Sequence, residues 1–178
     1  MSTLFVNNLN TASGTSIALA SGKTLDASAG VLTPSAGQIV QIATNTITQG
    51  TFQTTSGTFT DVTGWFVNIT PKFNNSKIIW RTNVTSNIND GDGYGRFRVV
   101  DANNSDTVIH TNVYCGQSNY YAATSEWMEN HYSCVMASSG TTSAMQLQLQ
   151  VLVSNGGTYS ANWSSGDVRL IEAIEIKV

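Results

Sequence analysis

Met145-Gln-Leu-Gln-Leu-Gln-Val-Leu-Val153 is the longest uninterrupted alternation in the chain, and it decides the fold class. Its odd-numbered positions are apolar, whereas Gln146, Gln148 and Gln150 are amides. Side chains of a β-strand alternate between its two faces, so this period of two predicts a strand with one apolar and one polar face. We expect the glutamine face either to meet solvent or to form the polar wall of an interface between copies of the chain.

Two groups of turn residues follow this strand. Asn155-Gly-Gly157 leads into Thr158–Ser164, and Ser165-Gly-Asp167 leads into Val168–Val178. Short glycine-containing turns between alternating segments are typical of strands that return along one another. The end of the chain is therefore predicted to form three consecutive antiparallel strands.

The same alternation recurs upstream, so we assign residues 44–178 to one β domain. Thr44–Thr55 is predicted to be a connector or an edge strand, and further strands are expected over 58–62, 65–70, 77–88, 94–100, 107–113 and 126–137. Turns spaced by roughly 8 to 12 residues in an all-β segment of this size predict an antiparallel sandwich, most simply a jelly roll. Side chains predicted to point inward are Trp65, Val67, Ile69, Ile78, Trp80, Thr82, Val84, Ser86, Ile88, Phe97, Val99, Met128, Tyr132, Cys134, Met136 and Trp163.

Residues 1–43 follow a different pattern and are predicted to form an N-terminal arm. Gly14, Gly22 and Gly30 recur every eight residues, with short apolar groups between them. Ordering the backbone costs about 1–2 kcal/mol per residue, whereas burying one aliphatic side chain gains about 1.5–3 kcal/mol, so strands this short cannot be stable alone. The apolar residues that would serve oligomerisation or attachment are Ile17, Leu19, Leu25, Val31 and Leu32.

Three interpretations of this arm remain open. It can associate with other copies of the chain in an intertwined β-prism, dock on a larger particle, or be a disordered leader. We favour self-association, because the regular spacing of the apolar groups is not typical of a plain Ser/Gly/Ala linker.

The composition excludes several classes of function. Only 11% of residues are charged and the net charge is −3, with no local cluster of Lys and Arg, so no nucleic-acid partner is expected. No apolar run reaches the length of about 18 residues needed to span a membrane, so membrane insertion is not expected. Met1–Asn7 lacks the basic and apolar regions of a signal peptide, so we expect the protein to be made and kept in a cytoplasm.

Groups that could support catalysis or bind a cofactor are scarce. His110 and His131 are the only histidines, and neither has a metal-ligand spacing with a cysteine or carboxylate. Cys115 and Cys134 are expected to remain reduced in a reducing compartment. We predict no enzymatic activity and no cofactor.

Asn89-Asp-Gly-Asp-Gly93 is the sharpest turn signal and also the one weak candidate for a metal site. Asn89, Asp90 and Asp92 supply the oxygen ligands that Ca²⁺ prefers, but the bidentate glutamate that closes an EF-hand loop is missing. We favour a solvated hairpin turn that uses glycine for positive φ.

A second loop has the Tyr, Ser, Asn and Gly composition of adaptable binding surfaces. Its candidate receptor-binding residues are Tyr114, Asn119, Tyr120 and Tyr121. We favour a trimer contact or an ordinary surface loop here, and contact with a host-surface glycan is the alternative.

Several segments of the sequence resemble segments of small structural proteins of tailed bacteriophages, especially marine ones. These are Ser56-Gly-Thr-Phe-Thr-Asp-Val-Thr-Gly-Trp-Phe-Val-Asn-Ile-Thr-Pro-Lys72, Asn75-Ser-Lys-Ile-Ile79, Gly95-Arg-Phe-Arg98 and Glu172-Ala-Ile-Glu-Ile176. The opening Leu4-Phe-Val-Asn-Asn-Leu-Asn-Thr-Ala-Ser-Gly14 is similar to the leader of such proteins.

The resemblance implies a homotrimeric virion protein, fibre-like or knob-like. Its arm would attach to other tail or capsid proteins, and its jelly-roll head would be similar to complement-type and tumour-necrosis-factor-type trimers. A tail or head fibre is the leading interpretation. The alternatives are a capsid decoration or cement protein, a carbohydrate-binding β-sandwich module, and a glycan-cleaving enzyme.

Overall fold

The computed structural model describes residues 34–48, 50–89, 94–117, 128–136, 139–154, 156–161 and 169–178. These residues form ten strands and one short 3₁₀ helix. The elements are β1 (Ile39–Ile47), β2 (Phe52–Thr54), β3 (Thr60–Ile69), β4 (Lys77–Asn89), β5 (Tyr94–Asp101), η1 (Ala102–Asn104), β6 (Thr107–Gln117), β7 (Met128–Met136), β8 (Met145–Val153), β9 (Thr158–Ala161) and β10 (Arg169–Ile176). Residues 1–33, which hold the repeat and the predicted attachment residues Ile17, Leu19, Leu25, Val31 and Leu32, lie outside the described part.

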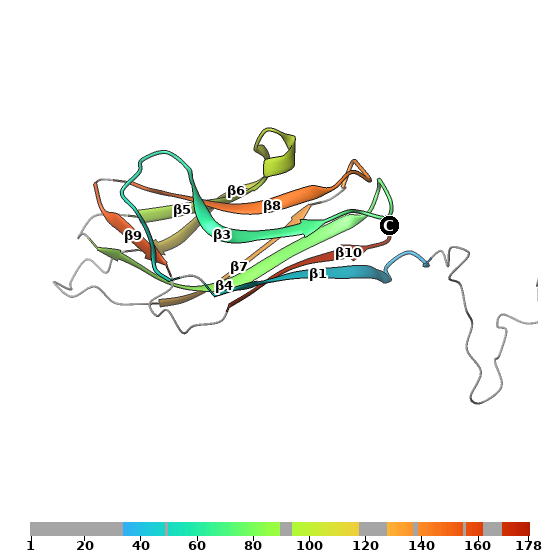
Figure 1. The fold of residues 1–178 in the computed structure, drawn as a ribbon, viewed down its shortest axis with the longest axis horizontal. Coiled ribbons are helices and arrows are strands. Elements are labelled where there is room, and N and C mark those ends of the chain that lie inside the picture. Colours follow the sequence, from blue (N-terminus) through green and yellow to red (C-terminus); the bar gives the residue numbers. More distant parts are fainter. Residues whose placement is uncertain are drawn as a thin grey trace, which may run out of the picture. The chain divides into compact units, whose positions relative to one another are not determined.

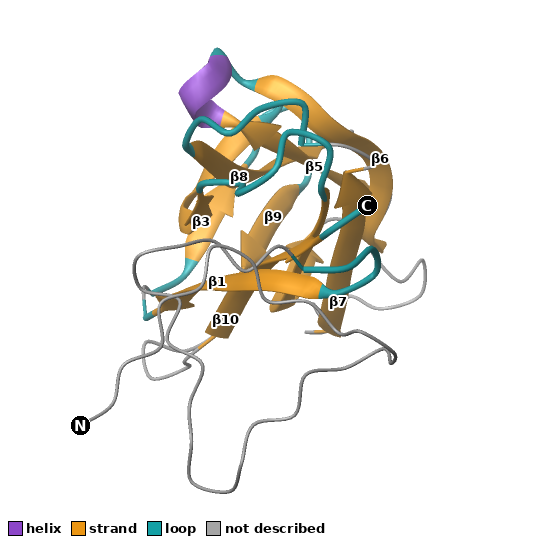
Figure 2. Cartoon of the chain, turned by 90° about the vertical axis from the view of Figure 1, so that its right-hand side faces the viewer, coloured by secondary structure: helices purple, strands orange, loops and turns teal. Residues whose placement is uncertain are grey.

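The strands form two antiparallel sheets that face each other (Figures 1 and 2). In the first sheet the order is β1-β10-β4-β9-β2, with β7 on β4, and in the second it is β3-β8-β5-β6. The strand β4 is long enough to pair with both β10 and β9 along one side while β7 pairs along the other. This antiparallel sandwich, with one six-stranded and one four-stranded sheet and with connections that cross between them, confirms the predicted all-β, jelly-roll-like fold.

The predicted pairing of the last three strands is wrong, although all three strands exist. β8 pairs with β3 and β5, whereas β9 and β10 belong to the other sheet. Likewise β4 and β5 lie in different sheets, so the segment joining them does not close the hairpin expected at Asn89–Gly93. The connections after β4 and after β8 therefore lead from one sheet to the other, whereas β9 and β10 both pair with β4 within the first sheet.

The first strand extends across the predicted boundary between arm and head at residues 43 and 44. β1 pairs with β10 from Ile39 to Ile47, and the compact unit of the body begins at Pro34. The apolar pair Ile39 and Val40, which the sequence pattern assigned to the arm, therefore belongs to the first sheet.

A bulge in β3 explains why its sequence predicted two strands. The register with β8 shifts between Asp61 and Phe66, and Gly64 within the bulge adopts φ +79°. From Asp61 to Phe66, five steps along β3 match two steps along β8, and the additional residues change which positions face inward, so that Val62 and Trp65 are both buried. The segments 58–62 and 65–70, which the sequence predicts as two strands, thus belong to one strand, β3, that the bulge interrupts.

Two of the three glutamines of β8, Gln148 and Gln150, are buried within the chain and do not face solvent, whereas Gln146 is half-buried. The side chain of Gln148 is buried and donates from Nε2 to the carbonyls of Val62 at 2.9 Å and Trp65 at 3.2 Å. Gln150 is also buried, donating to Asp61 and accepting from Arg98. The amides therefore satisfy backbone and side-chain groups around the β3 bulge.

The core between the sheets confirms most of the predicted inward residues, Met136 being partly buried and the side chain of Met128 not described. Trp65 and Trp80 are each 1% exposed, and the ring of Phe97 from the second sheet stacks on Tyr132 from the first with centroids 4.3 Å apart. Cys134 is a free cysteine, and burial raises the pKa of its thiol to about 12, so the thiol stays protonated at neutral pH. Trp163 lies outside the described residues.

One buried carboxylate joins three segments at the end of the first sheet. Glu175 of β10 is fully buried and accepts hydrogen bonds from the hydroxyl of Ser76, the backbone N–H groups of Lys72 and Phe73, and the amide of Gln41. Burial by itself raises the pKa of Glu175, but these hydrogen bonds outweigh it and hold the pKa below its ordinary value. The carboxylate thus ties β10 to β1 and to the connection between β3 and β4.

Replacing Gln148 by Met should lower the free energy of unfolding by about 1–3 kcal/mol, because buried carbonyls lose their donor. The matched control is Gln146→Met, at a half-buried position whose amide donates to Asn68, with an expected loss below about 0.5 kcal/mol. Urea denaturation followed by tryptophan fluorescence measures both, and equal losses would show that Gln148 does not support the bulge.

Stability should fall in acid through Glu175. Its folded pKa lies below the ordinary value of 4.5, so the ionised form stabilises the native state above that pH, and this stabilisation is lost as the pH falls through the folded pKa. Glu175→Gln replaces one acceptor oxygen with an N–H₂ group that faces hydrogen-bond donors whichever oxygen it replaces, and it should destabilise the protein by about 1–3 kcal/mol at pH 7. The difference between wild type and variant should shrink toward pH 3 in urea titrations; a difference independent of pH would contradict the assignment.

Candidate functional site

The outer face of the first sheet carries a continuous row of aliphatic side chains. Ile42 of β1 lies opposite Ile174 of β10, which lies opposite Ile79 of β4, which in turn lies opposite Val135 of β7. These four residues, here named the aliphatic row, cross the sheet at one level from edge to edge.

The two ends of the aliphatic row are the most exposed. Ile42 and Val135 are each 54% exposed, while Ile174 is buried between its neighbours. Ile39 and Leu170, at other levels of the same sheet, are 58% and 44% exposed. Isolated apolar side chains are ordinary on a protein surface, but a contiguous set marks an interaction surface.

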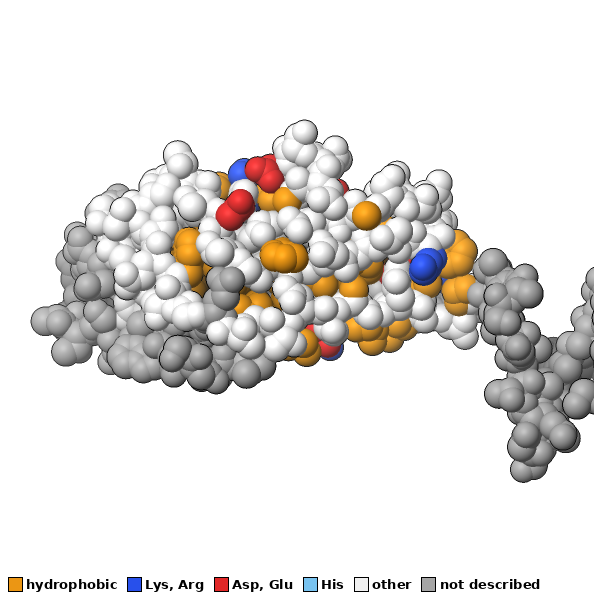
Figure 3. Space-filling view, viewed as in Figure 1, with side chains coloured by type: hydrophobic (Ala, Val, Ile, Leu, Met, Phe, Trp, Pro, Cys, Tyr) orange, Lys and Arg blue, Asp and Glu red, His pale blue; other side chains and the backbone are white. Residues whose placement is uncertain are grey.

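Figure 3 shows this pattern against a surface with few charges. In the orientation of Figure 1, hydrophobic side chains gather along the lower margin of the body, where β1 runs, and most of the remaining described surface is neither acidic nor basic. The polar surface consists largely of hydroxyls, amides and backbone, as the 11% content of charged residues requires.

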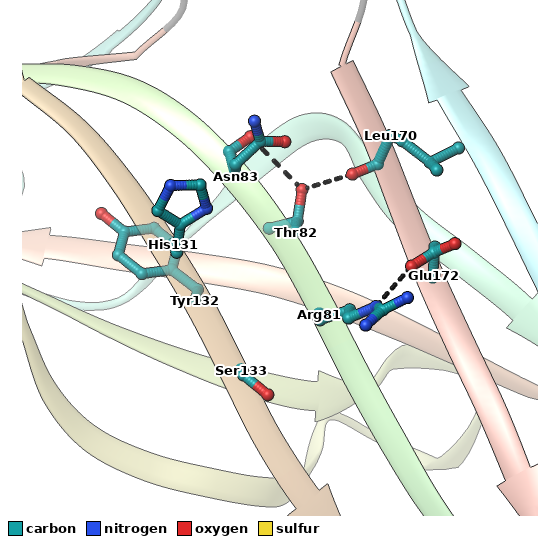
Figure 4. A pocket seen from close by; sticks show the side chains of 8 residues that line it. All are labelled: Arg81, Thr82, Asn83, His131, Tyr132, Ser133, Leu170 and Glu172. Carbon is teal, nitrogen blue, oxygen red and sulfur yellow. Dashed lines mark hydrogen bonds and ion pairs between the residues drawn. The ribbon is translucent and has the colours of Figure 1, made fainter.

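An ion pair lies in the next row along the strands. Glu172 of β10 and Arg81 of β4 are cross-strand neighbours, and Arg81 Nε donates to Glu172 Oε2 (Figure 4). The Arg81 side chain is 56% exposed and that of Glu172 is 18% exposed. Thr44 and Ser133 flank the pair on β1 and β7, so the row is polar but nearly neutral.

A shallow depression of about 440 Å³ opens beside this ion pair. Its lining comes from β4, β7 and β10 and comprises Arg81, Thr82, Asn83, His131, Tyr132, Ser133, Leu170 and Glu172 (Figure 4). The hydroxyl of Thr82 donates to the Leu170 carbonyl at 2.9 Å and fixes the two strands against each other. With donors, acceptors and one apolar side chain, the depression is suited to a hydroxyl-rich ligand or to polar contacts with another protein.

The described residues do not bring together a metal-binding cluster. In the described ranges, no three His, Cys, Asp or Glu side chains gather closely enough to hold a metal ion. Nor does that part of the chain contain a helix long and apolar enough to cross a membrane.

Most of the sequence-predicted site residues fall outside the described ranges. Asn89 is the last residue of β4, with its backbone opposite Thr158, but Asp90 and Asp92 are not described, so the calcium candidate remains an expectation. Tyr114 belongs to β6, opposite Arg96. The other residues of its loop, Asn119, Tyr120 and Tyr121, are not described.

Sequence reasoning missed the aliphatic row because the row exists only across strands. A signal is nevertheless present in the sequence: Ile79 and Val135 each interrupt a strict alternation whose other apolar members point inward. In the sequence of a single strand, one outward-facing aliphatic residue does not indicate an interaction surface. Only the pairing register shows that the outward-facing aliphatic residues of four strands lie opposite one another.

No family model and no curated protein sequence matches the chain. Among solved structures it is similar to the VP2 subviral particle of infectious bursal disease virus, with 10% sequence identity, a TM-score of 0.39 and coverage of 79% of this chain and 38% of that chain. It is also similar to T=1 particles derived from infectious bursal virus, with 12% identity, a TM-score of 0.44 and coverage of 88% and 40%. The chain thus spans about two fifths of the length of these viral proteins.

The ion pair between Arg81 and Glu172 should contribute little to folding, because Arg81 is more than half exposed. A double-mutant cycle with Arg81→Gln and Glu172→Gln, measured by urea denaturation in dilute protein, should give a coupling energy below about 1 kcal/mol that decreases with added NaCl. A salt-independent coupling of several kcal/mol would instead make the pair a determinant of the fold.

Proposed function

We propose that this chain is a non-enzymatic structural protein of a bacteriophage particle, a homotrimeric fibre or knob subunit of the tail or head. Its N-terminal arm attaches it to other virion proteins, and its jelly-roll head projects outward. The protein is assembled in the host cytoplasm and resides in the virion.

What supports this proposal is a head with a buried core of its own, together with an arm whose sequence predicts that it cannot become ordered alone. The buried core cluster of the described residues runs from Ile47 to Ala173, entirely within the jelly roll. The arm offers only one or two aliphatic residues per repeat, which is too little to offset its ordering entropy. Such an arm requires other copies or a particle surface to complete its core.

The mechanism of such a subunit is assembly. Three arms wound together supply one another with buried surface, and three heads are then held at short distance from each other. Linked copies let individually weak contacts act together, so a poor affinity of one head for a host surface is multiplied. The proposed receptor-binding loop contains Tyr114, Asn119, Tyr120 and Tyr121.

A second candidate function is favoured by the depression on the first sheet. Its polar lining and volume of about 440 Å³ suit a carbohydrate, and a β-sandwich with one such site would be a carbohydrate-binding module. The remaining alternative for a virion subunit is a capsid decoration or cement protein. Such a subunit differs from a fibre in the virion protein to which its arm attaches, and not in the chemistry of its head.

Purified full-length protein should have a mass three times that of its 19.0 kDa chain. Size-exclusion chromatography with multi-angle light scattering, supported by native mass spectrometry, measures this directly. A trimer whose first 43 residues resist proteolysis supports the proposal. A monomer at all concentrations, with those residues rapidly digested, would remove it and leave the carbohydrate-binding module as the better explanation.

A further inference from the structure

The depression on the first sheet is built from residues that the pairing of three strands sets side by side. Glu172 of β10 lies opposite Arg81 of β4, which lies opposite Ser133 of β7, and one row further along Asn83 lies opposite His131 (Figure 4). Strands about 4.8 Å apart and rows about 7 Å apart give a patch of about 10 by 7 Å. Its volume of about 440 Å³ lies within the range of small-molecule sites, about 300–1,000 Å³.

Several polar groups of this patch have no protein partner in the described part of the chain. Arg81 donates there only from Nε, to Glu172, so both terminal NH₂ groups of its guanidinium are unpaired. The Ser133 hydroxyl and the His131 ring form no hydrogen bond with those residues either. Amides elsewhere on the first sheet, such as that of Asn45, donate to a backbone carbonyl. The depression therefore presents polar groups that water or a ligand can satisfy.

The charges of the depression favour an uncharged ligand. Arg81 and Glu172 neutralise each other, so an anion or a cation is repelled by one member of the pair. A sugar hydroxyl both donates and accepts, so two adjacent hydroxyls can accept from the guanidinium and donate to the carboxylate together. Leu170, which is 44% exposed, offers an apolar contact to the C–H groups of a sugar ring.

We infer that this depression binds a neutral hexose through two adjacent hydroxyls, with Arg81 and Glu172 as the polar contacts and Leu170 as the apolar contact. The inference deepens the proposed function by naming the chemistry that the outward head contacts, and it rests on that function for the host surface as the source of the sugar. Hydrogen bonds to the sugar replace hydrogen bonds to water, so they select the ligand more than they add affinity. One head therefore binds weakly, and linked heads bind together.

The first test measures binding of three neutral sugars, the methyl α-pyranosides of glucose, mannose and galactose, to the full-length protein. Saturation-transfer difference NMR follows each titration. The methyl glucuronide, which carries a carboxylate in place of the primary alcohol of the glucoside, is the charged comparison. We expect at least one neutral sugar to bind with a Kd of about 1–10 mM, and the glucuronide to bind at least about fivefold more weakly. No binding of any neutral sugar, or tighter binding of the glucuronide, would overturn the inference.

Two variants, each with a matched control, locate the site. Arg81→Gln removes the guanidinium and Leu170→Ser removes the apolar contact, and each should weaken binding about tenfold. Lys77→Gln removes an exposed cation of β4 outside the depression, and Val108→Ser removes a 41% exposed valine of β6 in the second sheet. Both controls should keep the wild-type Kd, and circular dichroism with urea denaturation verifies that all four variants fold. Site variants that bind like the controls would place the sugar elsewhere and overturn the assignment.

Light scattering on the same samples separates this inference from the proposed function. A trimer that binds none of the neutral sugars overturns the inference and leaves the structural role standing. A monomer that binds one of them, and loses it through Arg81→Gln and Leu170→Ser, removes the proposed trimer and retains the site. That second outcome is the one expected of a carbohydrate-binding module.

Discussion

The hydrogen bonds to the Glu175 carboxylate are the constraint on which the first sheet depends. Four donors from β1 and from the connection between β3 and β4 converge on this fully buried group. A carboxylate can be buried only where its charge is met by such donors, so Glu175 has one acceptable position. Because neighbouring residues of a strand face opposite sides, Ile174 must then point outward. A slip of β10 by one residue would expose the carboxylate and bury Ile174. The internal network thus determines which side of the sheet displays the aliphatic row.

The strands of this protein could be predicted from alternation, but their partners could not. Met145–Val153 is a strand with the predicted bounds, and Ile78, Trp80 and Val84 point inward as expected. A glycine-rich turn, however, reverses the chain equally well within one sheet or between two, so turn residues do not specify a hairpin. Gln148 shows a second limit of prediction from sequence. An amide in an alternating strand is expected to face solvent, but the amide of Gln148 is buried because carbonyls of the neighbouring β3 bulge accept its hydrogen bonds. That bulge is a property of β3, far away in sequence.

The candidate surface was less predictable than the fold for a related physical reason. Catalytic and metal sites gather rare residue types, which a sequence displays openly, whereas an assembly surface uses common aliphatic residues. Ile79 and Val135 differ from core residues only in occupying the alternate positions of their strands. Which alternate positions of neighbouring strands lie together is known only once the pairing register is known. The residues that composition did highlight, the tyrosines around Tyr120 and the acidic turn around Asp90, lie outside the described part, so both remain expectations.

The low charge of the chain favours a particular kind of association. Where charges occur in the described body they are largely engaged, Arg81 with Glu172 and Arg98 with Gln150, and the Arg98 guanidinium also lies 4.4 Å from the centroid of the Phe59 ring. A surface of hydroxyls and amides exerts little long-range attraction, so its encounters are not steered by charge. Any affinity of this surface for a partner must then come mainly from apolar burial and shape. Contacts of this kind are short in range and barely screened by salt, in contrast to ion pairs weakened over a Debye length of about 10 Å. A neutral, amide-rich head with one aliphatic row is therefore suited to assembly that does not depend on ionic strength.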